Sequence, residues 1–384
     1  MPIDLKFLGE KLQKYRNQLQ LEVEELAVRT RISTEKLTQF ESGLKEPTGD
    51  EILILSDFYK CDYRFFISNE KTAPFERIET LYRMFGDSFS KEDRQAIQEF
   101  IFLCECEEFC LAELGRKKTN HFSIDLIGDN FKDHGRQAAE GFRSWLKYGQ
   151  EQLTKENIFE DFRELGIHVF RRKLFNSNIS GLFINHPNAG KCVLVNYLDD
   201  VFRQRFTVAH EVCHSILDAT DQDIVVSFSD WRKTDLVEVR ANSFAGHYLV
   251  PKGFVKKIVT SNGFQNKELI SKFAFQLNVN TEVLLRRLAE ARVITKAEIY
   301  SLKSIIPKSK KNDPELSGDY TGRILHSIKS LLERGLSSFY VHLCHDAYRE
   351  HKVSAGRLAE MLLVSENELP GVLDLFKLKL EYDG

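Results

Sequence analysis

The sequence lacks long apolar runs: nowhere do about eighteen apolar residues follow one another, and the first residues, MPIDLKFLGEKLQKYR, hold no apolar core behind a basic start. Prolines are few, eight in 384 residues, and neither sign of charge predominates, because the formal net charge is −3. We therefore expect a folded, cytoplasmic chain without a membrane segment, in which any contact with nucleic acid depends on a local patch.

Cysteines are also sparse, and the seven present are odd in number and lack the even spacing of a disulfide framework. This favours a reducing compartment. Cys104, Cys106 and Cys110 are close in sequence, but on a helix residue 104 points about 160° away from residue 106, so three thiolates cannot converge on a metal. We interpret them as ordinary helix residues, and the basic tract at 308–311 as solvated chain.

The length predicts several domains at roughly 100 to 200 residues each. In residues 1–70, apolar residues recur at helical spacing in short bursts, which predicts four short helices. Ser33 is the expected N-cap of one of them, and the layout of this helix and the preceding one is that of a helix-turn-helix. Four further units are expected. A helical connector covers residues 71–124 and a larger mixed domain covers 125–300. A linker follows at 301–319, and a small C-terminal helical unit that is itself helix-turn-helix-like covers 320–384.

The mixed domain, residues 125–300, combines strands with helices. Three β-branched segments that begin at residues 166, 179 and 191 are bounded by Gly181, Pro187-Asn188 and Gly190, which predicts three strands of one small sheet. Helices are expected over 199–218, 235–250 and 266–291. The fold class predicted for the whole chain is α+β and mostly helical, with an all-α N-terminal domain.

The sharpest motif is RFTVAHEVCHSILD, in which His210, Glu211 and His214 form H-E-x-x-H within a predicted helix. Residues 210 and 214 lie on one face of a helix, so two imidazoles can converge on one Zn²⁺ ion with Glu211 beside it. Such a site needs a third protein ligand and one open position.

The second helix, in EVRANSFAGHYLVP, supplies a third ligand in Glu238. Asn242, one turn later on the same face, could hold a ligand side chain by a hydrogen bond. The alternative is a solvated glutamate and an ordinary mid-helix asparagine. Because the neighbouring positions make this helix apolar and buried, we favour Glu238 as a ligand.

This ligand set predicts metal-assisted peptide hydrolysis, with Glu211 as the general base. The group that helps to stabilise the oxyanion is not fixed by the sequence. Four side chains are candidates, each with an ordinary surface or core role as the alternative: His186, Tyr197, His247 and Tyr248.

RFTVAHEVCH, followed by EVRANSFAGHYLVP and preceded by SGLFINHPNAGKCVLVN, resembles the ImmA/IrrE family of zinc metallopeptidases, in the long form with an N-terminal XRE-type helix-turn-helix. The resemblance covers most of residues 1–295. It implies a zincin-like domain with a gluzincin-like site: His210, His214 and Glu238 as zinc ligands and Glu211 as the catalytic glutamate. It also implies that the chain cleaves or inactivates a cognate repressor, or regulates genes of a mobile element or a stress response.

Two residues depart from the family pattern. Cys213 stands where the family usually has glycine, and Asp218 where a histidine often follows the motif. Cys213 is interpreted as an inert buried thiol, with redox sensitivity as the alternative. Asp218, one turn beyond His214, could accept a hydrogen bond from that ring, or simply end the helix.

The N-terminal domain leaves two interpretations open. Residues 1–70 hold ten Lys and Arg against thirteen Asp and Glu, whereas a DNA footprint is locally basic. The domain therefore either binds DNA, weakly or with a partner, or serves dimerisation or protein recognition. The side chains expected at DNA come from the recognition helix and its flank: Arg31, Thr34, Lys36, Thr38 and Gln39.

Two functions are consistent with the sequence. In the first, the chain is a zinc endopeptidase and transcriptional regulator that cleaves a repressor or partner protein. In the second, it is a DNA-binding regulator or the antitoxin of a toxin–antitoxin pair, and the zinc domain is a sensor or scaffold with little turnover. A protein partner, a repressor or a toxin, is expected in both, and the chain could also form a homodimer.

Overall fold

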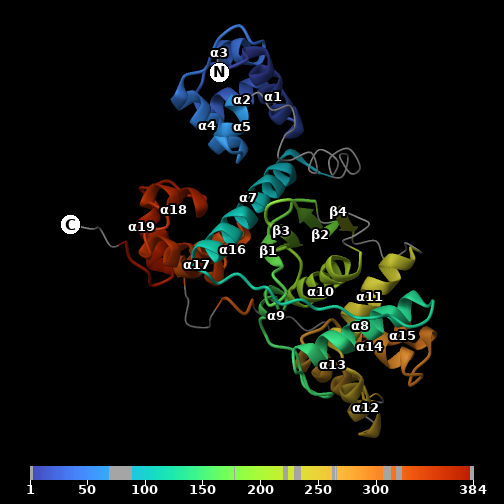
Figure 1. Ribbon diagram of the computed structural model, residues 1–384. Helices are drawn as coiled ribbons and strands as arrows, with labels where there is room; N and C mark the ends of the chain where they lie inside the picture. Colours follow the sequence, from blue (N-terminus) through green and yellow to red (C-terminus); the bar gives the residue numbers. More distant parts are fainter. Residues whose placement is uncertain are drawn as a thin grey trace.

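The structure is a computed structural model that describes residues 3–68, 89–176, 178–218, 224–228, 235–261, 264, 266–305, 313–316 and 322–380. The first part of the expected helical connector, residues 71–88, and most of the expected linker at 301–319 lie outside these residues. Figure 1 shows an N-terminal helical bundle, a central region with the sheet, and a group of C-terminal helices beside it.

The N-terminal bundle has a core of leucines and aromatic rings, among them Leu37, Phe40 and Tyr59. The Ser33 side chain accepts a hydrogen bond from the backbone N–H of Lys36 and so caps the third helix, as the sequence predicts. A short fifth helix follows the four that were predicted. The bundle consists of α1 (Leu5–Gln18), α2 (Val23–Thr30), α3 (Thr34–Glu41), α4 (Gly49–Tyr59) and α5 (Tyr63–Ile67).

A single long helix, α7 (Lys91–Glu113), connects this bundle to the rest of the molecule (Figure 1). Its first turns contact the bundle: Lys91 Nζ lies 2.8 Å from Glu25 Oε2, and Arg94 donates to the backbone oxygen of Gln18 at 2.9 Å. The helix ends at Glu113, and Gly115 follows it with a φ of +62°, in the left-handed region that favours glycine. Residues 116–130 are not helical.

The sheet contains the three predicted strands, β1 (His168–Arg172), β2 (Ile179–His186) and β3 (Gly190–Asn196), and also a fourth, β4 (Ile224–Phe228). The strand order is β1-β3-β2-β4, with β1 parallel to β3 and the other pairs antiparallel. Gly181, expected at a strand boundary, lies inside β2 at an irregularity in its pairing with β4.

Both faces of this sheet are buried, which explains why the strands read as nearly continuous apolar runs. Successive residues of β3 belong to different cores: Val193 packs with the helices over residues 201–217 and 236–249, and Leu194 with α7 and the C-terminal helices. Phe183 and Leu182 of β2 divide in the same way. The sheet therefore separates two hydrophobic cores.

The first core lies between the sheet and the helices that carry the sequence motif. Each of these two helices begins at an aspartate cap, Asp200 for α10 (Val201–Leu217) and Asp235 for α11 (Leu236–Leu249). Helices α8 and α11 pack closely together along their length. The other helices on this side are α8 (Phe131–Trp145), α9 (Phe159–Arg163), α12 (Lys252–Thr260), α13 (Lys267–Gln276), α14 (Thr281–Glu290) and α15 (Lys296–Ile305).

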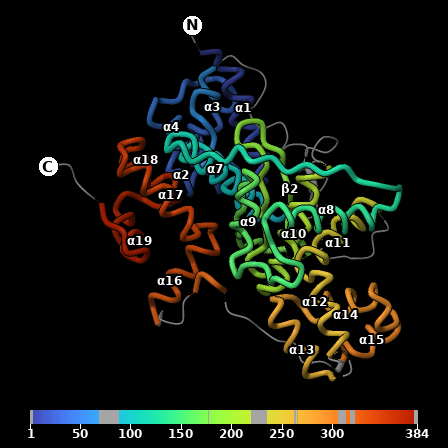
Figure 2. The backbone as a smooth tube through the Cα atoms, turned by 60° about the horizontal axis from the view of Figure 1, so that its bottom comes forward, coloured from blue at the N-terminus to red at the C-terminus, as the bar shows by residue number. Residues whose placement is uncertain are grey.

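The second core joins α7 to the sheet and to the C-terminal helices. Cys104, Cys106 and Cys110 are buried free thiols in it, in accord with their interpretation as ordinary helix residues. In Figure 2 the C-terminal helices and α12–α15 lie on opposite sides of the central region. The C-terminal helices are α16 (Gly322–Glu333), α17 (Ser338–Arg349), α18 (Ala355–Met361) and α19 (Leu369–Leu375). Within the described residues, no helix is both long and apolar enough to cross a membrane.

Candidate metal centre

The structure brings His210, His214 and Glu238 together. The two histidines lie one turn apart on the inner face of α10, where they are 6% and 0% exposed. Their Nε2 atoms are 3.1 Å apart. Glu238, in the first turn of α11, places Oε2 3.3 Å from Nε2 of His210 and Oε1 3.5 Å from Nε2 of His214. These three side chains form a donor cluster suited to a metal ion.

The other nitrogen of each ring has its own partner. Nδ1 of His210 lies 3.1 Å from Oδ1 of Asn242, and Nδ1 of His214 lies 2.8 Å from Oδ2 of Asp218. These contacts turn both Nε2 atoms toward Glu238. Asp218 also forms an ion pair with Arg240, a residue of this site that the sequence analysis did not identify.

The donor set fits a zinc ion. Tetrahedral zinc with bonds of about 2.0 to 2.1 Å separates its ligand atoms by roughly 3.3 Å, close to the distances found here. Two imidazole nitrogens and a carboxylate are ligands that zinc takes in catalytic sites. Burial favours the neutral form of Glu238, but hydrogen bonds from His210 and His214 outweigh it and hold the pKa of this carboxyl well below its usual range.

Glu211 follows the first histidine on α10 and is fully buried. One of its carboxylate oxygens lies against Gly181 of β2: a Cβ added to that glycine would be 3.2 Å from Oε1 of Glu211. The same Cβ would be 2.6 Å from Cγ2 of Thr207 and 2.9 Å from the backbone oxygen of Leu194. Gly181 therefore leaves the space that Glu211 occupies, a role that the sequence analysis missed.

Cys213 is fully buried in the core between α10 and the sheet. Burial raises the pKa of its thiol, and Glu238 and Glu211 add to this effect. A thiol that stays protonated is a poor nucleophile and metal ligand. The structure thus favours the inert interpretation of this residue over redox sensitivity.

The structure does not bring the four oxyanion candidates to this cluster; each has contacts elsewhere. His186 accepts hydrogen bonds from the backbone of the β2–β3 turn, and Tyr197 stacks with Arg171. The Tyr248 hydroxyl donates to Asp161 at 2.6 Å, and His247 donates from Nδ1 to the oxygen of Ser243. None of these contacts involves a residue of the donor cluster.

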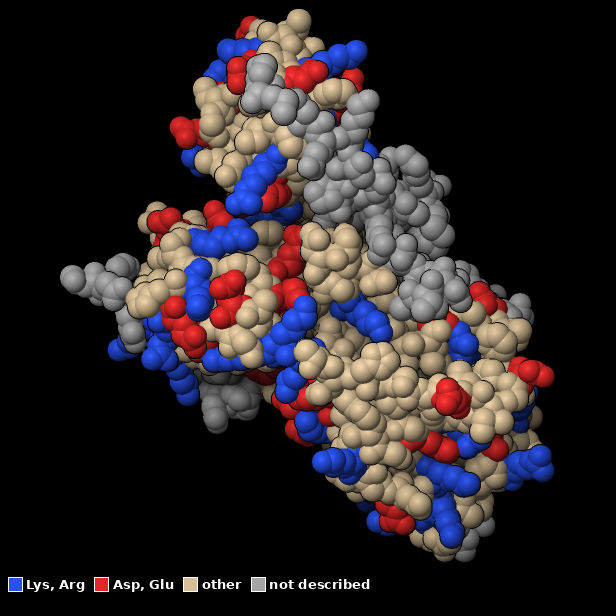
Figure 3. Space-filling view, in the orientation of Figure 1, with Lys and Arg blue, Asp and Glu red and all other residues tan. Residues whose placement is uncertain are grey.

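The side chains expected at DNA lie on or beside α3, at the end of the molecule away from the sheet (Figure 1). Arg31, Lys36 and Thr38 are exposed, whereas Thr34 and Gln39 are half-buried. Lys36 is engaged in an ion pair with Glu51 at 2.7 Å. On the face of the bundle seen in Figure 3, basic and acidic side chains alternate rather than form a basic patch.

The fold and the donor cluster define a metallopeptidase-type domain joined to a helix-turn-helix bundle. Comparison with known families agrees: residues 162–289 match the IrrE N-terminal-like domain, and residues 8–63 match a helix-turn-helix domain. The chain therefore combines the two domains that the resemblance to the ImmA/IrrE family implied. None of the curated proteins compared with the chain matches it.

Proposed function

We propose that the chain is a zinc-dependent endopeptidase that acts as a transcriptional regulator by cleaving a cognate repressor or partner protein. The observation that carries this proposal is the convergence of His210, His214 and Glu238 with Glu211 buried beside them. A peptidase-type domain on the same chain as a helix-turn-helix supports a target in gene regulation.

In this mechanism the two histidines and Glu238 hold the zinc ion. When bound, zinc polarises a substrate carbonyl and lowers the pKa of a water molecule toward about 7. Glu211 accepts the proton of the attacking water at its carboxylate, and later passes it to the leaving amine. Asn242 and Asp218 keep the two rings oriented through their Nδ1 atoms, so little reorganisation is needed during the reaction.

The N-terminal bundle would bind DNA through α3 in this proposal. Helix α7 meets the bundle at α2, through the pairs of Lys91 with Glu25 and Arg29 with Gln95. The exposed residues of α3 can therefore approach a groove without rearrangement of the bundle. The mixed charge of the N-terminal bundle predicts a weak affinity for DNA that depends only slightly on salt concentration.

The test is a substrate trap with Glu211→Gln, which removes the base but no ligand. Tagged wild type, Glu211→Gln and the matched control Glu140→Gln, on the outer part of α8, are purified from cells after crosslinking. We expect equal zinc in all three, and one protein that is retained intact by Glu211→Gln and cut in the other two. Full activity of Glu211→Gln in cells would contradict the peptidase; the same intact partner on all three would favour a scaffold or antitoxin.

A further inference from the structure

Helix α8 meets the metal centre at Arg240, two residues after Glu238 on α11. Residues 131–145 of α8 lie outside the segment 162–289 that matches the peptidase-type family. The two helices are in direct backbone contact, because a Cβ added to Gly135 of α8 would lie 2.2 Å from the backbone oxygen of Arg240. Glycine at this position therefore allows α8 to pack against α11 beside a ligand of the donor cluster.

The side chain of Arg240 is covered by an aromatic ring of α8. Phe131, one turn before Gly135, has its ring centroid 5.0 Å from the guanidinium carbon of Arg240, within the range of a cation–π contact. The arginine side chain is only 12% exposed. A long side chain that is free in solvent samples many rotamers, so this contact restricts where the guanidinium can lie.

The guanidinium in turn contacts the residue that orients His214. Nη2 of Arg240 forms an ion pair with Oδ1 of Asp218, whereas Oδ2 of the same carboxylate lies 2.8 Å from Nδ1 of His214. The two oxygens of Asp218 have different partners on two different helices. Rotation of the carboxylate away from His214 would therefore also break its contact with Arg240.

The position of Asp218 requires a positive charge nearby. Asp218 is the C-cap of α10, at the negative end of the helix dipole, and its side chain is 6% exposed. A buried carboxylate is costly unless it is paired and hydrogen-bonded. His214 provides a hydrogen bond but no positive charge when it binds a metal, because a ligating histidine is neutral. Arg240 supplies the charge.

We propose that Arg240 is a positioning residue of the metal centre, which acts on His214 through Asp218 and is itself held by Phe131. This inference rests on the proposed zinc site. Arg240 does not contact the metal; it keeps the carboxylate in place, so that Nε2 of His214 stays directed toward Glu238. Helix α8 thereby contributes to the geometry of a site whose ligands lie on α10 and α11.

Zinc affinity separates positioning from a simple effect of charge. Arg240→Met removes a cation near the ion, which by charge alone would strengthen zinc binding. Positioning predicts the opposite sign, with an affinity about tenfold weaker, as for other residues that orient a ligand. Phe131→Leu weakens it about threefold through the lost ring contact. Arg240→Lys recovers part of the loss, since it keeps the charge but not the planar fork.

A double-mutant cycle tests whether Arg240 acts through Asp218. Zinc affinity of the full chain is measured by competition with a fluorescent chelator for Arg240→Met, Asp218→Asn and the double variant. We expect the double variant to bind zinc no more weakly than Asp218→Asn, because the two residues act in series. Arg136→Met, the same substitution on the surface of α8, is the control and should bind as the wild type does. Additive losses, or an equal or higher affinity in Arg240→Met, would overturn the proposal.

A second measurement needs no metal. In the metal-free full chain with isotope-labelled histidine, NMR shows which ring nitrogen of His214 carries the proton, and His214→Ala identifies its signals. We expect the proton on Nδ1, toward Asp218, in the wild type, and a mixture of both neutral tautomers in Arg240→Met and Phe131→Leu.

The two measurements fail for different reasons. If Arg240→Met does not fold, Phe131→Leu decides, since it removes only the ring contact. An unchanged tautomer in the folded variants would overturn the proposal. Absence of zinc binding by the wild type would instead contradict the proposed function, and the tautomer of His214 would still decide the role of Arg240.

Discussion

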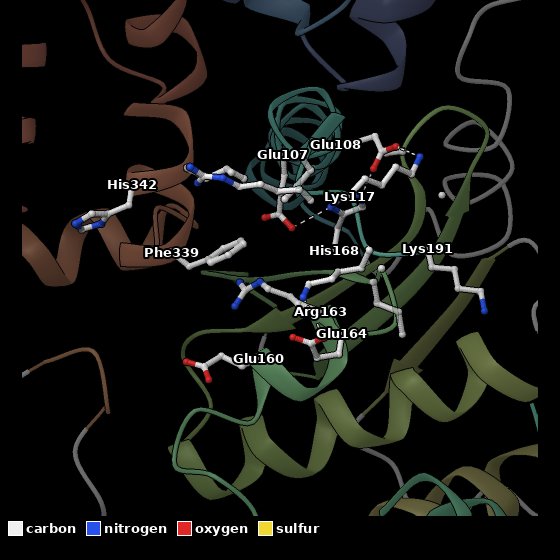
Figure 4. Close-up of a pocket in the computed structure, with 18 of the residues that line it drawn as sticks. Glu107, Glu108, Lys117, Glu160, Arg163, Glu164, His168, Lys191, Phe339 and His342 are labelled. Carbon is white, nitrogen blue, oxygen red and sulfur yellow. Dashed lines mark hydrogen bonds and ion pairs between the residues drawn. The ribbon is translucent and has the colours of Figure 1, made fainter. Parts of the chain in front are cut away.

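The two sides of the sheet contain polar clusters that differ in how their groups are paired. Next to α10, each histidine has a partner at Nδ1 and directs Nε2 toward Glu238, so the donors converge on one point. Next to α7, Glu107 and Arg163 each retain a buried atom that has no hydrogen-bond partner among the described residues, and both border a large cavity (Figure 4). The first arrangement is preorganised for a single ion, whereas the second has room for an organic molecule.

This contrast has a physical cause in how each cluster is built. The ligands of the first lie on two neighbouring helices that pack directly against each other, so the core on either side fixes them. The second is bordered by segments from residue 107 to residue 346, and the C-terminal helices close one side of it. Its shape therefore depends on how α17 packs against α7.

The largest effect is expected when one of the three converging donor side chains is removed. His214→Ala should reduce the zinc content from about one ion per chain to near zero, because two ligands rarely hold zinc at a catalytic site. Zinc is measured by elemental mass spectrometry of the purified full chain. His342→Ala, on the exposed side of α17, is the control and should keep its zinc. Full zinc in His214→Ala would place the metal elsewhere.

A substitution at Gly181 tests whether cleavage depends on the position of the Glu211 carboxylate. Gly181→Ala forces a Cβ to within 2.6 Å of Cγ2 of Thr207, so either β2 or α10 must shift. We expect a loss of roughly a hundredfold in cleavage, from a small misplacement of the base, with zinc retained and a lower Tm. Cleavage of the trapped protein and thermal unfolding are the measurements.

Two further variants sharpen this test. Adding Thr207→Ser removes the atom in closest contact and should restore part of the loss. Gly371→Ala is the matched control, since its Cβ would meet nothing within 4 Å. If Gly181→Ala were as active and stable as wild type, the proposed fit between Gly181 and Glu211 would be wrong.

A smaller effect is expected from the partner of His214. Asp218→Asn keeps the shape but weakens the charge that orients the ring, and should lower zinc affinity about 10- to 100-fold. Competition with a fluorescent chelator measures the affinity. Asp346→Asn, at the exposed ion pair with Arg116, is the control. Equal zinc affinity in Asp218→Asn and wild type would show that Asp218 only ends the helix.

Much of the fold follows from local sequence signals. Ser33 marks the start of α3, and Asp200 and Asp235 mark the starts of α10 and α11, because a capping side chain needs only its own helix. The spacing of His210 and His214 places them on one face for the same reason. Local periodicity was therefore enough to predict the helices that position the metal centre.

Long-range packing explains what could not be predicted. Gly181 looked like a strand boundary, since a sequence cannot show that Glu211 and Thr207 occupy the space beside it. The strand Ile224–Phe228 has a β-branched run, but it falls between the two helices that carry the motif and was not identified. The cavity beside Arg163 required the position of α17, which no local pattern contains.

The last prediction concerns His168 at the edge of the cavity. Burial favours its neutral form, but Glu107 at 2.9 Å and Glu108 at 3.4 Å outweigh it and raise the pKa of the ring to about 10. Since the folded-state pKa lies above the unfolded value of about 6.5, its contribution to stability is complete below that pH. It is lost as the pH rises toward 10.

We therefore expect the free energy of unfolding of the wild type to fall between about pH 6.5 and pH 10, and more steeply than that of His168→Gln, which has no titrating ring. Urea unfolding at several pH values measures the difference. His326→Gln, on α16 outside this cluster, is the matched control and should follow the wild type. If His168→Gln and wild type had the same pH dependence, the ring would not be charged in the folded chain. His168 would then not balance the charges of Glu107 and Glu108.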